Sequence, residues 1–170
     1  LDAPITGGAA GAEHGTLTYM VGGAAAALER CRPVFATSAA RIVHTGALGT
    51  GAATKLCNNL MLYMELLAAH EAAALARSAG VAIETLIEVS RSGGIMSDAM
   101  ASVIAFGDHL AAAPDDEALL ARARHFVALA DKDLGVALDC AAAEGLALPG
   151  TAACRALMAR TYGLTEEATR

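Results

Sequence analysis

Residues 46–59 read GALGTGAATKLCNN, a glycine-rich turn that runs directly into an alanine-rich segment. Because alanine is the best helix former, we expect a helix from about Ala52 onward. On that helix Lys55 and Asn59 are four residues apart and therefore share one face. An ammonium group beside an amide group can hold one substrate oxygen and supply it with a proton. The stretch predicts the start of a long helix and, on it, a candidate catalytic pair.

The asparagines strengthen this interpretation of Lys55. A lysine by itself on an alanine-rich helix is usually a solvated surface residue. Asparagine, however, is a mediocre residue for a helix interior, because its side chain competes for backbone hydrogen bonds. Asn58 and Asn59 follow one another on the same turn as Lys55, next to a glycine turn. Local inconsistency of this kind is typical of a functional site.

From residue 51 onward the pattern is almost entirely helical, with apolar residues at helical spacing. Helices are predicted over residues 52–79, 83–91, 97–106, 115–144 (as one helix or two) and from Pro149 to near Gly163. On the first of these the predicted apolar faces carry Leu56, Leu60, Tyr63, Leu67, Ala74 and Leu75.

Residues 1–46 differ in character, because short β-like runs alternate with glycine. Strands are predicted over residues 1–5, 16–21 and 41–45, with a helix over 24–36 that Pro33 should end or kink. A three-stranded sheet with one helix has open edges and little to bury its second face. We therefore expect a mostly α chain in which the last part of a larger α/β domain precedes a helical domain.

Composition excludes several classes of function. The net charge is −6 without a basic run, which argues against nucleic acid as a partner. The longest uncharged stretch, residues 14–28, is glycine-rich and shorter than the roughly 20 apolar residues of a membrane span. Asp2 and Pro4 interrupt the place where a signal peptide would begin its apolar core. The four cysteines lack CxxC spacing, which predicts buried, reduced thiols in a cytoplasmic protein without a metal site.

Two further groups of residues are candidates for ligand binding or catalysis. Thr6, Gly7 and Gly8 follow the first predicted strand, where glycine backbones let N–H groups approach an anion and the threonine adds a hydroxyl. They suit a small carboxylate, and an ordinary strand-end turn is the alternative. Lys132 and Asp133 lie in a helical stretch, where such a pair is by itself most often a surface feature. The GxxGxG spacing of residues 46–51 is not the dinucleotide-binding fingerprint.

Together these segments resemble the β-hydroxyacid dehydrogenases, a family that includes 3-hydroxyisobutyrate dehydrogenase and tartronate semialdehyde reductase. Residues 1–23, LDAPITGGAAGAEHGTLTYMVGG, resemble the family's substrate-loop motif DAPxSGGxxGAxxGTLxxMVGG. GTGAATKLCNN, residues 49–59, resembles its catalytic motif GxGxxxKxxNN, and KDL at 132–134 resembles a third motif on a late helix. The three occur in the family's order and at about its spacing, over essentially the whole chain.

The resemblance implies a role for each matching residue. Lys55 is implied as the catalytic lysine, Asn59 as a holder of the substrate oxygen, and Lys132 as a neighbour of the nicotinamide end of NAD or NADP. Thr6, Gly7 and Gly8 are implied to bind the substrate carboxylate. A lysine that exchanges a proton near neutral pH needs a pKa below its ordinary value of about 10.4. An apolar site and a cationic nicotinamide both act in that direction.

The resemblance also implies a domain organisation. Residues 1–46 correspond to the end of an NAD(P)-binding Rossmann-like domain, and residues 47–170 to an all-helical substrate and dimerisation domain of the 6-phosphogluconate dehydrogenase C-terminal-like type. We expect a fragment without the cofactor phosphate-binding half, inactive alone, from a cytoplasmic enzyme that oxidises a small 3-hydroxy acid and forms a homodimer or homotetramer.

Two positions depart from the family's pattern. Thr6 replaces a serine, and His125 stands where the family commonly has phenylalanine, with Phe126 one position later. The alternative function is a non-enzymatic helical dimerisation or scaffold module derived from the family. Relatives that abandon this chemistry often lack the lysine, so the presence of Lys55 and Asn59 favours an enzyme.

Overall fold

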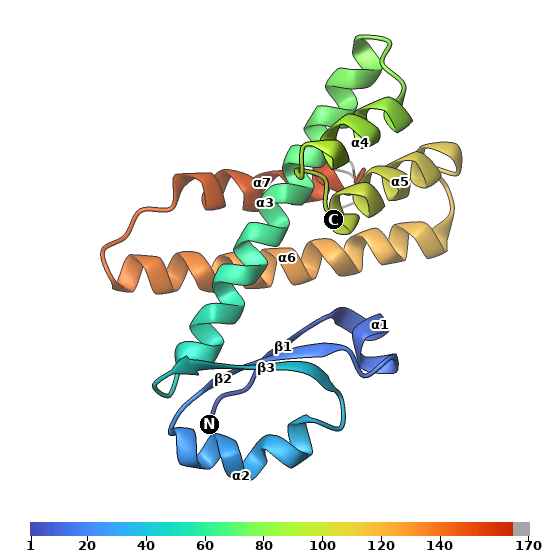
Figure 1. The fold of residues 1–170 in the computed structure, drawn as a ribbon. Coiled ribbons are helices and arrows are strands. Elements are labelled where there is room, and N and C mark those ends of the chain that lie inside the picture. Colours follow the sequence, from blue (N-terminus) through green and yellow to red (C-terminus); the bar gives the residue numbers. More distant parts are fainter. Residues whose placement is uncertain (165–170) are drawn as a thin grey trace. The chain divides into compact units, whose positions relative to one another are not determined.

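The computed structural model describes residues 1–164 and divides into two compact units, Leu1–Asn59 and Leu60–Arg170. The helix α3 (Thr50–Ser78) begins in the first unit and continues into the second. Figure 1 shows a small sheet with its helices in the first unit and only helices in the second. The predicted mostly α fold with a small α/β part is confirmed.

The first unit has five elements before α3. These are β1 (Ile5–Thr6), α1 (Gly8–Glu13), β2 (Leu17–Gly22), α2 (Ala25–Phe35) and β3 (Ala39–Gly46). The strand order is β1-β2-β3, with β1 antiparallel and β3 parallel to the central strand β2. The helix α2 forms the crossover between the two parallel strands, as such a pairing requires.

Three details of the first unit differ from the sequence prediction. The first strand covers only Ile5–Thr6, whereas residues 1–5 were predicted, and Asp2 forms an isolated β-bridge with Gly22. The short helix α1 replaces a predicted loop, because its glycine-containing sequence gives a weak helix signal. Pro33 does not end α2, which continues two residues further to Phe35, so the proline lies in the last turn.

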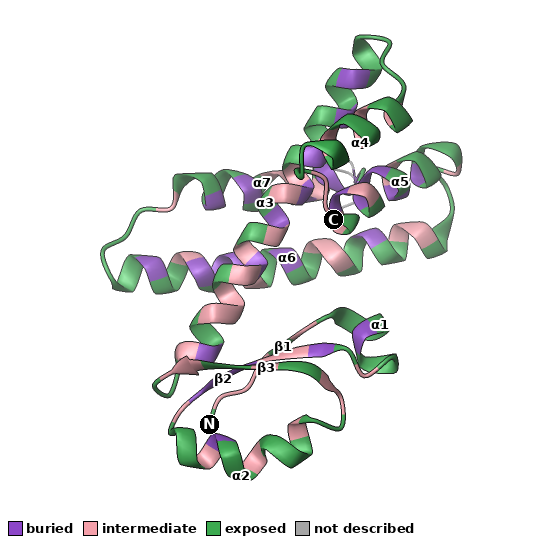
Figure 2. Cartoon of the chain, viewed as in Figure 1, coloured by how far each residue is buried: buried purple, intermediate pink, exposed green. Residues whose placement is uncertain are grey.

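The core of the first unit is small and centred on β2. Leu17, Met20 and Val21 of this strand are buried together with Leu28 of α2 (Figure 2). The rings of Tyr19 and Phe35 stack with their centroids 4.9 Å apart, which adds an aromatic contact between β2 and α2.

The second unit contains the rest of α3 and four further helices. These are α4 (Ile83–Ser92), α5 (Asp98–Ala112), α6 (Glu117–Ala143) and α7 (Pro149–Thr161). Ser97 caps α5 by accepting a hydrogen bond from the Met100 N–H group, and Asp116 caps α6 in the same way. The predicted 115–144 segment is therefore one helix, and α5 is longer than predicted.

The core of the second unit includes only some of the apolar positions predicted on α3. Tyr63 lies in this core and Leu67 packs against it, but the prediction is wrong for Ala74 and Leu75. Leu75 is 71% exposed and Ala74 is also exposed, whereas the core contains Leu66, Ala69 and Ala73. Alanine on several sides of the helix makes the apolar face ambiguous in the sequence. Within residues 1–164 no helix has the combination of length and hydropathy that crossing a bilayer requires.

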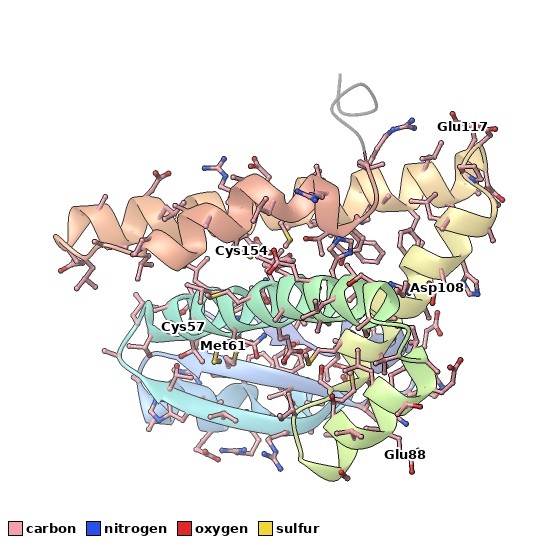
Figure 3. All side chains as sticks on the ribbon, turned by 90° about the horizontal axis from the view of Figure 1, so that it is seen from above. Cys57, Met61, Glu88, Asp108, Glu117 and Cys154 are labelled. Atoms are coloured by element: carbon pink, nitrogen blue, oxygen red, sulfur yellow. The ribbon has the colours of Figure 1, made fainter. Side chains whose placement is uncertain are left out.

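The cysteines are only partly as predicted. All four are free thiols, but Cys57 and Cys140 are exposed, so the expectation that they are buried is wrong for this pair. Cys154 of α7 lies in the core of the second unit (Figure 3), where burial raises the pKa of its thiol. The exposed pair lies on the outer sides of long helices, which a count of cysteines cannot reveal.

Candidate functional site

The turn before Lys55 is fixed by the carboxylate of Asp2. Its Oδ1 accepts a hydrogen bond from the Gly49 N–H group at 2.7 Å, and its Oδ2 accepts one from Ala52 at 2.6 Å. These bonds, that of Gly49 first, hold the pKa of Asp2 below its usual range. A carboxylate at a helix N-terminus also interacts favourably with the helix dipole. The start of α3 is thereby tied to the beginning of the chain.

The turn is also fixed by backbone contact at two glycines. A Cβ atom on Gly51 would lie 2.5 Å from the Met20 carbonyl oxygen and 2.7 Å from Oδ2 of Asp2. A Cβ atom on Gly22 would lie 2.8 Å from both the Ala47 carbonyl oxygen and the Gly51 nitrogen. The end of β2 therefore meets the start of α3 so closely that only glycine fits at either position.

Lys55 and Asn59 both lie on α3, as predicted. Lys55 is partly buried, and Asn59 is only 8% exposed although its side chain is polar. The Nδ2 group of Asn58 donates a hydrogen bond to Oδ1 of Asn59 at 3.3 Å, which orients the second amide. A buried amide fixed by its neighbour suits a residue that must present one group in a set direction.

Thr6, Gly7 and Gly8 mark the end of β1 and the start of α1 in the same unit. Thr6 pairs with Thr18 of β2. Gly7 has φ 125° and Gly8 has φ 62°, and both are exposed. Their left-handed backbone explains the two glycines, and open space surrounds the Cα of Gly8. The geometry leaves room for a ligand against this turn.

Lys132 belongs to the second unit, on α6, and its side chain is 66% exposed. Its Nζ lies 3.0 Å from Oδ1 of Asp133. The Tyr63 hydroxyl, on α3, donates to Oδ2 of the same carboxylate at 3.1 Å. Sequence reasoning placed Tyr63 on an apolar face and missed this bond. A lone hydroxyl among aliphatic core positions is the signal that pointed to it.

Lysine is confined to the two motif positions. The sequence has 12 lysines and arginines, of which only Lys55 and Lys132 are lysines, so ten are arginines. Arginine stays protonated under all ordinary conditions, whereas lysine can lose and regain a proton when its surroundings lower its pKa. The two lysines of the chain therefore both lie at candidate site positions, and the ten other basic Lys or Arg positions are arginines.

The remaining candidates contribute less. His14 is exposed at the end of α1, where its Nδ1 lies 2.7 Å from the Ala10 carbonyl oxygen. His125 is exposed, while the ring of Phe126 stacks on Tyr162 at 5.5 Å and so belongs to the core side. Within the described residues, no group of three His, Cys, Asp or Glu side chains is arranged to hold a metal ion.

A pocket of about 180 Å³ lies between α3 and α7 of the second unit, and it contains none of the predicted site residues. Burial, together with the charge of Arg160, lowers the pKa of its His70. The lining residues are Leu67, His70, Glu71, Ala74, Leu157, Arg160 and Thr161.

Two family models match the chain. One, described as the NAD-binding domain of NADP-dependent 3-hydroxyisobutyrate dehydrogenase, matches residues 49–168. The other, the NAD binding domain of 6-phosphogluconate dehydrogenase, matches residues 1–46.

Individual relatives agree with these matches. A probable 3-hydroxyisobutyrate dehydrogenase of Mycobacterium tuberculosis is 36% identical over 149 residues, which is 88% of this chain and 50% of that protein. An NAD-dependent L-serine dehydrogenase of Pseudomonas aeruginosa is 47% identical over 96 residues, 55% of this chain and 32% of the relative. The solved M. tuberculosis 3-hydroxyisobutyrate dehydrogenase with L-serine has a TM-score of 0.73 at 31% identity, covering 95% of this chain and 55% of that one. The chain spans about half the length of the curated relatives it matches.

Proposed function

We propose, since the chain belongs to the β-hydroxyacid dehydrogenase family, that it acts in an NAD(P)-dependent dehydrogenase. In this proposal the chain supplies the catalytic lysine and the substrate-binding residues. The reaction interconverts a small 3-hydroxy acid and its semialdehyde by hydride transfer. The observation that carries the proposal is the restriction of lysine to positions 55 and 132 in a chain with ten arginines. Proton exchange explains a lysine at position 55, because arginine does not deprotonate in proteins, whereas Lys132 is proposed to act as a hydrogen-bond donor.

The substrate class follows from two separate groups of hydrogen-bond donors. Thr6, Gly7 and Gly8 offer a hydroxyl and exposed backbone N–H groups to a carboxylate. Lys55 and Asn59 offer an ammonium and an amide to the reacting oxygen. The named relatives support this division, because 3-hydroxyisobutyrate and L-serine each have a hydroxymethyl group on the carbon next to the carboxylate.

In the oxidation, the neutral amine of Lys55 accepts the proton of the substrate hydroxyl as the O–H bond breaks. Asn59 holds the same oxygen, so that it stays in line with Lys55 while the carbonyl forms. The carboxylate remains bound to Thr6 and the glycine turn, which fixes the carbon that loses a hydride. When bound, the oxidised nicotinamide would supply the acceptor for that hydride. In the reverse direction the ammonium of Lys55 returns the proton to the oxygen.

Among the described residues, Lys132 fits the nicotinamide end of the cofactor, whereas the glycine turn before α3 does not fit its phosphates. Lys132 carries an exposed ammonium that can donate a hydrogen bond to the carboxamide oxygen. The glycine turn before α3 does not fit the phosphates, because Asp2 already takes the N–H groups of Gly49 and Ala52. We therefore propose NAD or NADP as the cofactor, with its phosphates held by residues other than this turn.

The proposal is tested by substrate preference in the protein as its gene encodes it. We expect oxidation of 3-hydroxyisobutyrate or L-serine with NAD or NADP, and no oxidation of the 2-hydroxy acid lactate. Thr6→Val should raise KM for the acid about tenfold with little change in kcat, because one hydrogen bond to a charged group is lost. Thr18→Val, the cross-strand neighbour, is the matched control. Absence of turnover with every 3-hydroxy acid would refute the proposed function.

The domain and assembly expectations complete the proposal. Residues 1–46 form the end of a cofactor-binding domain, and residues 47–170 the substrate and dimerisation domain, which the two family matches support. A homodimer or homotetramer is supported by large apolar side chains exposed on the second unit, namely Met61, Leu75, Val89, Ile95 and Leu146. A cytoplasmic location is supported by four free thiols.

The lowered pKa of Asp2 leads to a prediction of how the free energy of unfolding depends on pH. Its folded-state pKa is depressed, so it contributes stability above its unfolded pKa and loses it as pH falls through the folded value. We expect the free energy of unfolding to decrease below about pH 4, and Asp2→Asn to remove part of that dependence. Urea unfolding followed by circular dichroism at several pH values measures both. Asp115→Asn changes the same charge at an exposed position and should leave the slope as it is.

A further inference from the structure

One carboxylate joins a buried phenol to an exposed ammonium in the second unit. Asp133 accepts the Tyr63 hydroxyl on Oδ2 at 3.1 Å, while Nζ of Lys132 lies 3.0 Å from Oδ1. Tyr63 and Asp133 are 70 positions apart in the sequence and come from α3 and α6. The three side chains therefore form one connected polar group, in which Tyr63 and Lys132 contact different oxygens of Asp133.

Tyr63 is a fixed donor in this group. It is 8% exposed and belongs to the core cluster of the second unit, so packing holds its ring in place. Burial and the charge of Asp133 raise its pKa well above the usual value, which keeps the hydroxyl protonated. A neutral donor paired with a carboxylate makes a stronger bond than one between neutral groups.

Lys132 and Asp133 are adjacent on α6, so their contact requires a particular orientation of the carboxylate. Adjacent residues on a helix point about 100° apart around its axis and do not face each other. Lys132 also has a flexible four-carbon side chain, of which 66% is exposed, against 16% for Asp133. The contact therefore depends on a carboxylate that is already turned toward Lys132. The bond from Tyr63 to the other oxygen contributes to that orientation.

We propose that Tyr63 is a positioning residue, whose hydroxyl orients Asp133 and through it holds the ammonium of Lys132 in place for the cofactor. The proposal rests on the proposed function, in which Lys132 lies beside the nicotinamide end. Tyr63 itself touches neither substrate nor cofactor in this scheme. In this proposal its effect on cofactor binding passes through Lys132, and this distinguishes it from a residue that merely fills the core.

A double-mutant cycle in the protein as its gene encodes it tests that route. Tyr63→Phe should raise KM for the cofactor about fivefold, with a smaller change in kcat. In a Lys132→Met background the same substitution should have almost no further effect, because the side chain that it positions is gone. Tyr162→Phe, another buried tyrosine of the same core, is the matched control and should leave KM unchanged. Equal effects of Tyr63→Phe in both backgrounds would overturn the proposal.

A second readout is independent of activity. Lysine labelled with ¹³C and ¹⁵N gives signals from only two residues, Lys55 and Lys132. We expect the two Hε protons of Lys132 to have distinct shifts when the side chain is held, and to converge in Tyr63→Phe but not in Tyr162→Phe. If Tyr63→Phe leaves the Lys132 signals unchanged, positioning is refuted. If they converge in a protein without hydroxy acid turnover, the positioning contact stands and the proposed function fails.

Discussion

Lys55→Ala is expected to lower kcat for 3-hydroxy acid oxidation by about 10³-fold, within the 10²- to 10⁴-fold range of general acid–base catalysis. In the proposed mechanism, the substitution removes the group that exchanges a proton with the substrate oxygen. KM for the acid should change much less, because we propose that Thr6 and the glycine turn hold the carboxylate separately. Steady-state kinetics with NAD and NADP measure both parameters.

Lys55→Arg separates charge from proton exchange. Arginine keeps the positive charge but does not deprotonate in proteins, so we expect this variant to be nearly as impaired as Lys55→Ala. Arg41→Ala, on the exposed side of β3, is the control for loss of a positive charge from the same unit. Near-normal turnover in Lys55→Arg would show that Lys55 acts only through its charge, and the proposed role would be wrong.

Gly51→Ala is expected to have the largest effect on stability. Its Cβ atom would lie 2.5 Å from the Met20 carbonyl oxygen, a backbone atom that cannot turn away. Overpacking of this kind typically costs about 1–3 kcal/mol, and the small core of the first unit offers little compensation. We expect partial unfolding of residues 1–59 at 25 °C, measured as loss of amide protection in β2 by hydrogen exchange.

Gly107→Ala is the matched control for that experiment. Gly107 lies inside α5 and has no atom within 4 Å of the Cβ that alanine would add. The substitution should therefore stabilise the protein by about 0.5–1 kcal/mol, because alanine is the better helix former. If Gly51→Ala proved as harmless as Gly107→Ala, the close crossing of β2 and α3 would be refuted.

The helix α3 and the placement of Lys55 and Asn59 on it could be predicted because the signals lie within one short stretch of sequence. A glycine turn, an alanine-rich segment and two adjacent asparagines all lie within residues 46–59, so helix propensity and four-residue spacing were sufficient. The helix α7 was equally predictable, because Pro149 marks its first turn and Gly163 follows its end. Thr6, Gly7 and Gly8 were recognisable as a strand end, although the short helix after them was not.

The contacts that position the site were not predictable in this way. Asp2 reaches residues 47 and 50 positions later, and Tyr63 reaches one 70 positions later. Helix propensity and hydrophobic period describe neighbours along one element, and neither indicates which distant carboxylate a side chain will meet. The exposed Leu75 shows the same limit, because alanines on several sides of α3 leave its core face undetermined until other helices pack against it.

The bonds of Asp2 constrain the order in which the chain acquires structure as it leaves the ribosome. The carboxylate has no partners until Gly49 and Ala52 have been synthesised and have emerged. Closing so long a loop is slower than forming a helix from adjacent residues. The turn before Lys55 can therefore be bound by the Asp2 carboxylate only after the residues of all three strands have been synthesised.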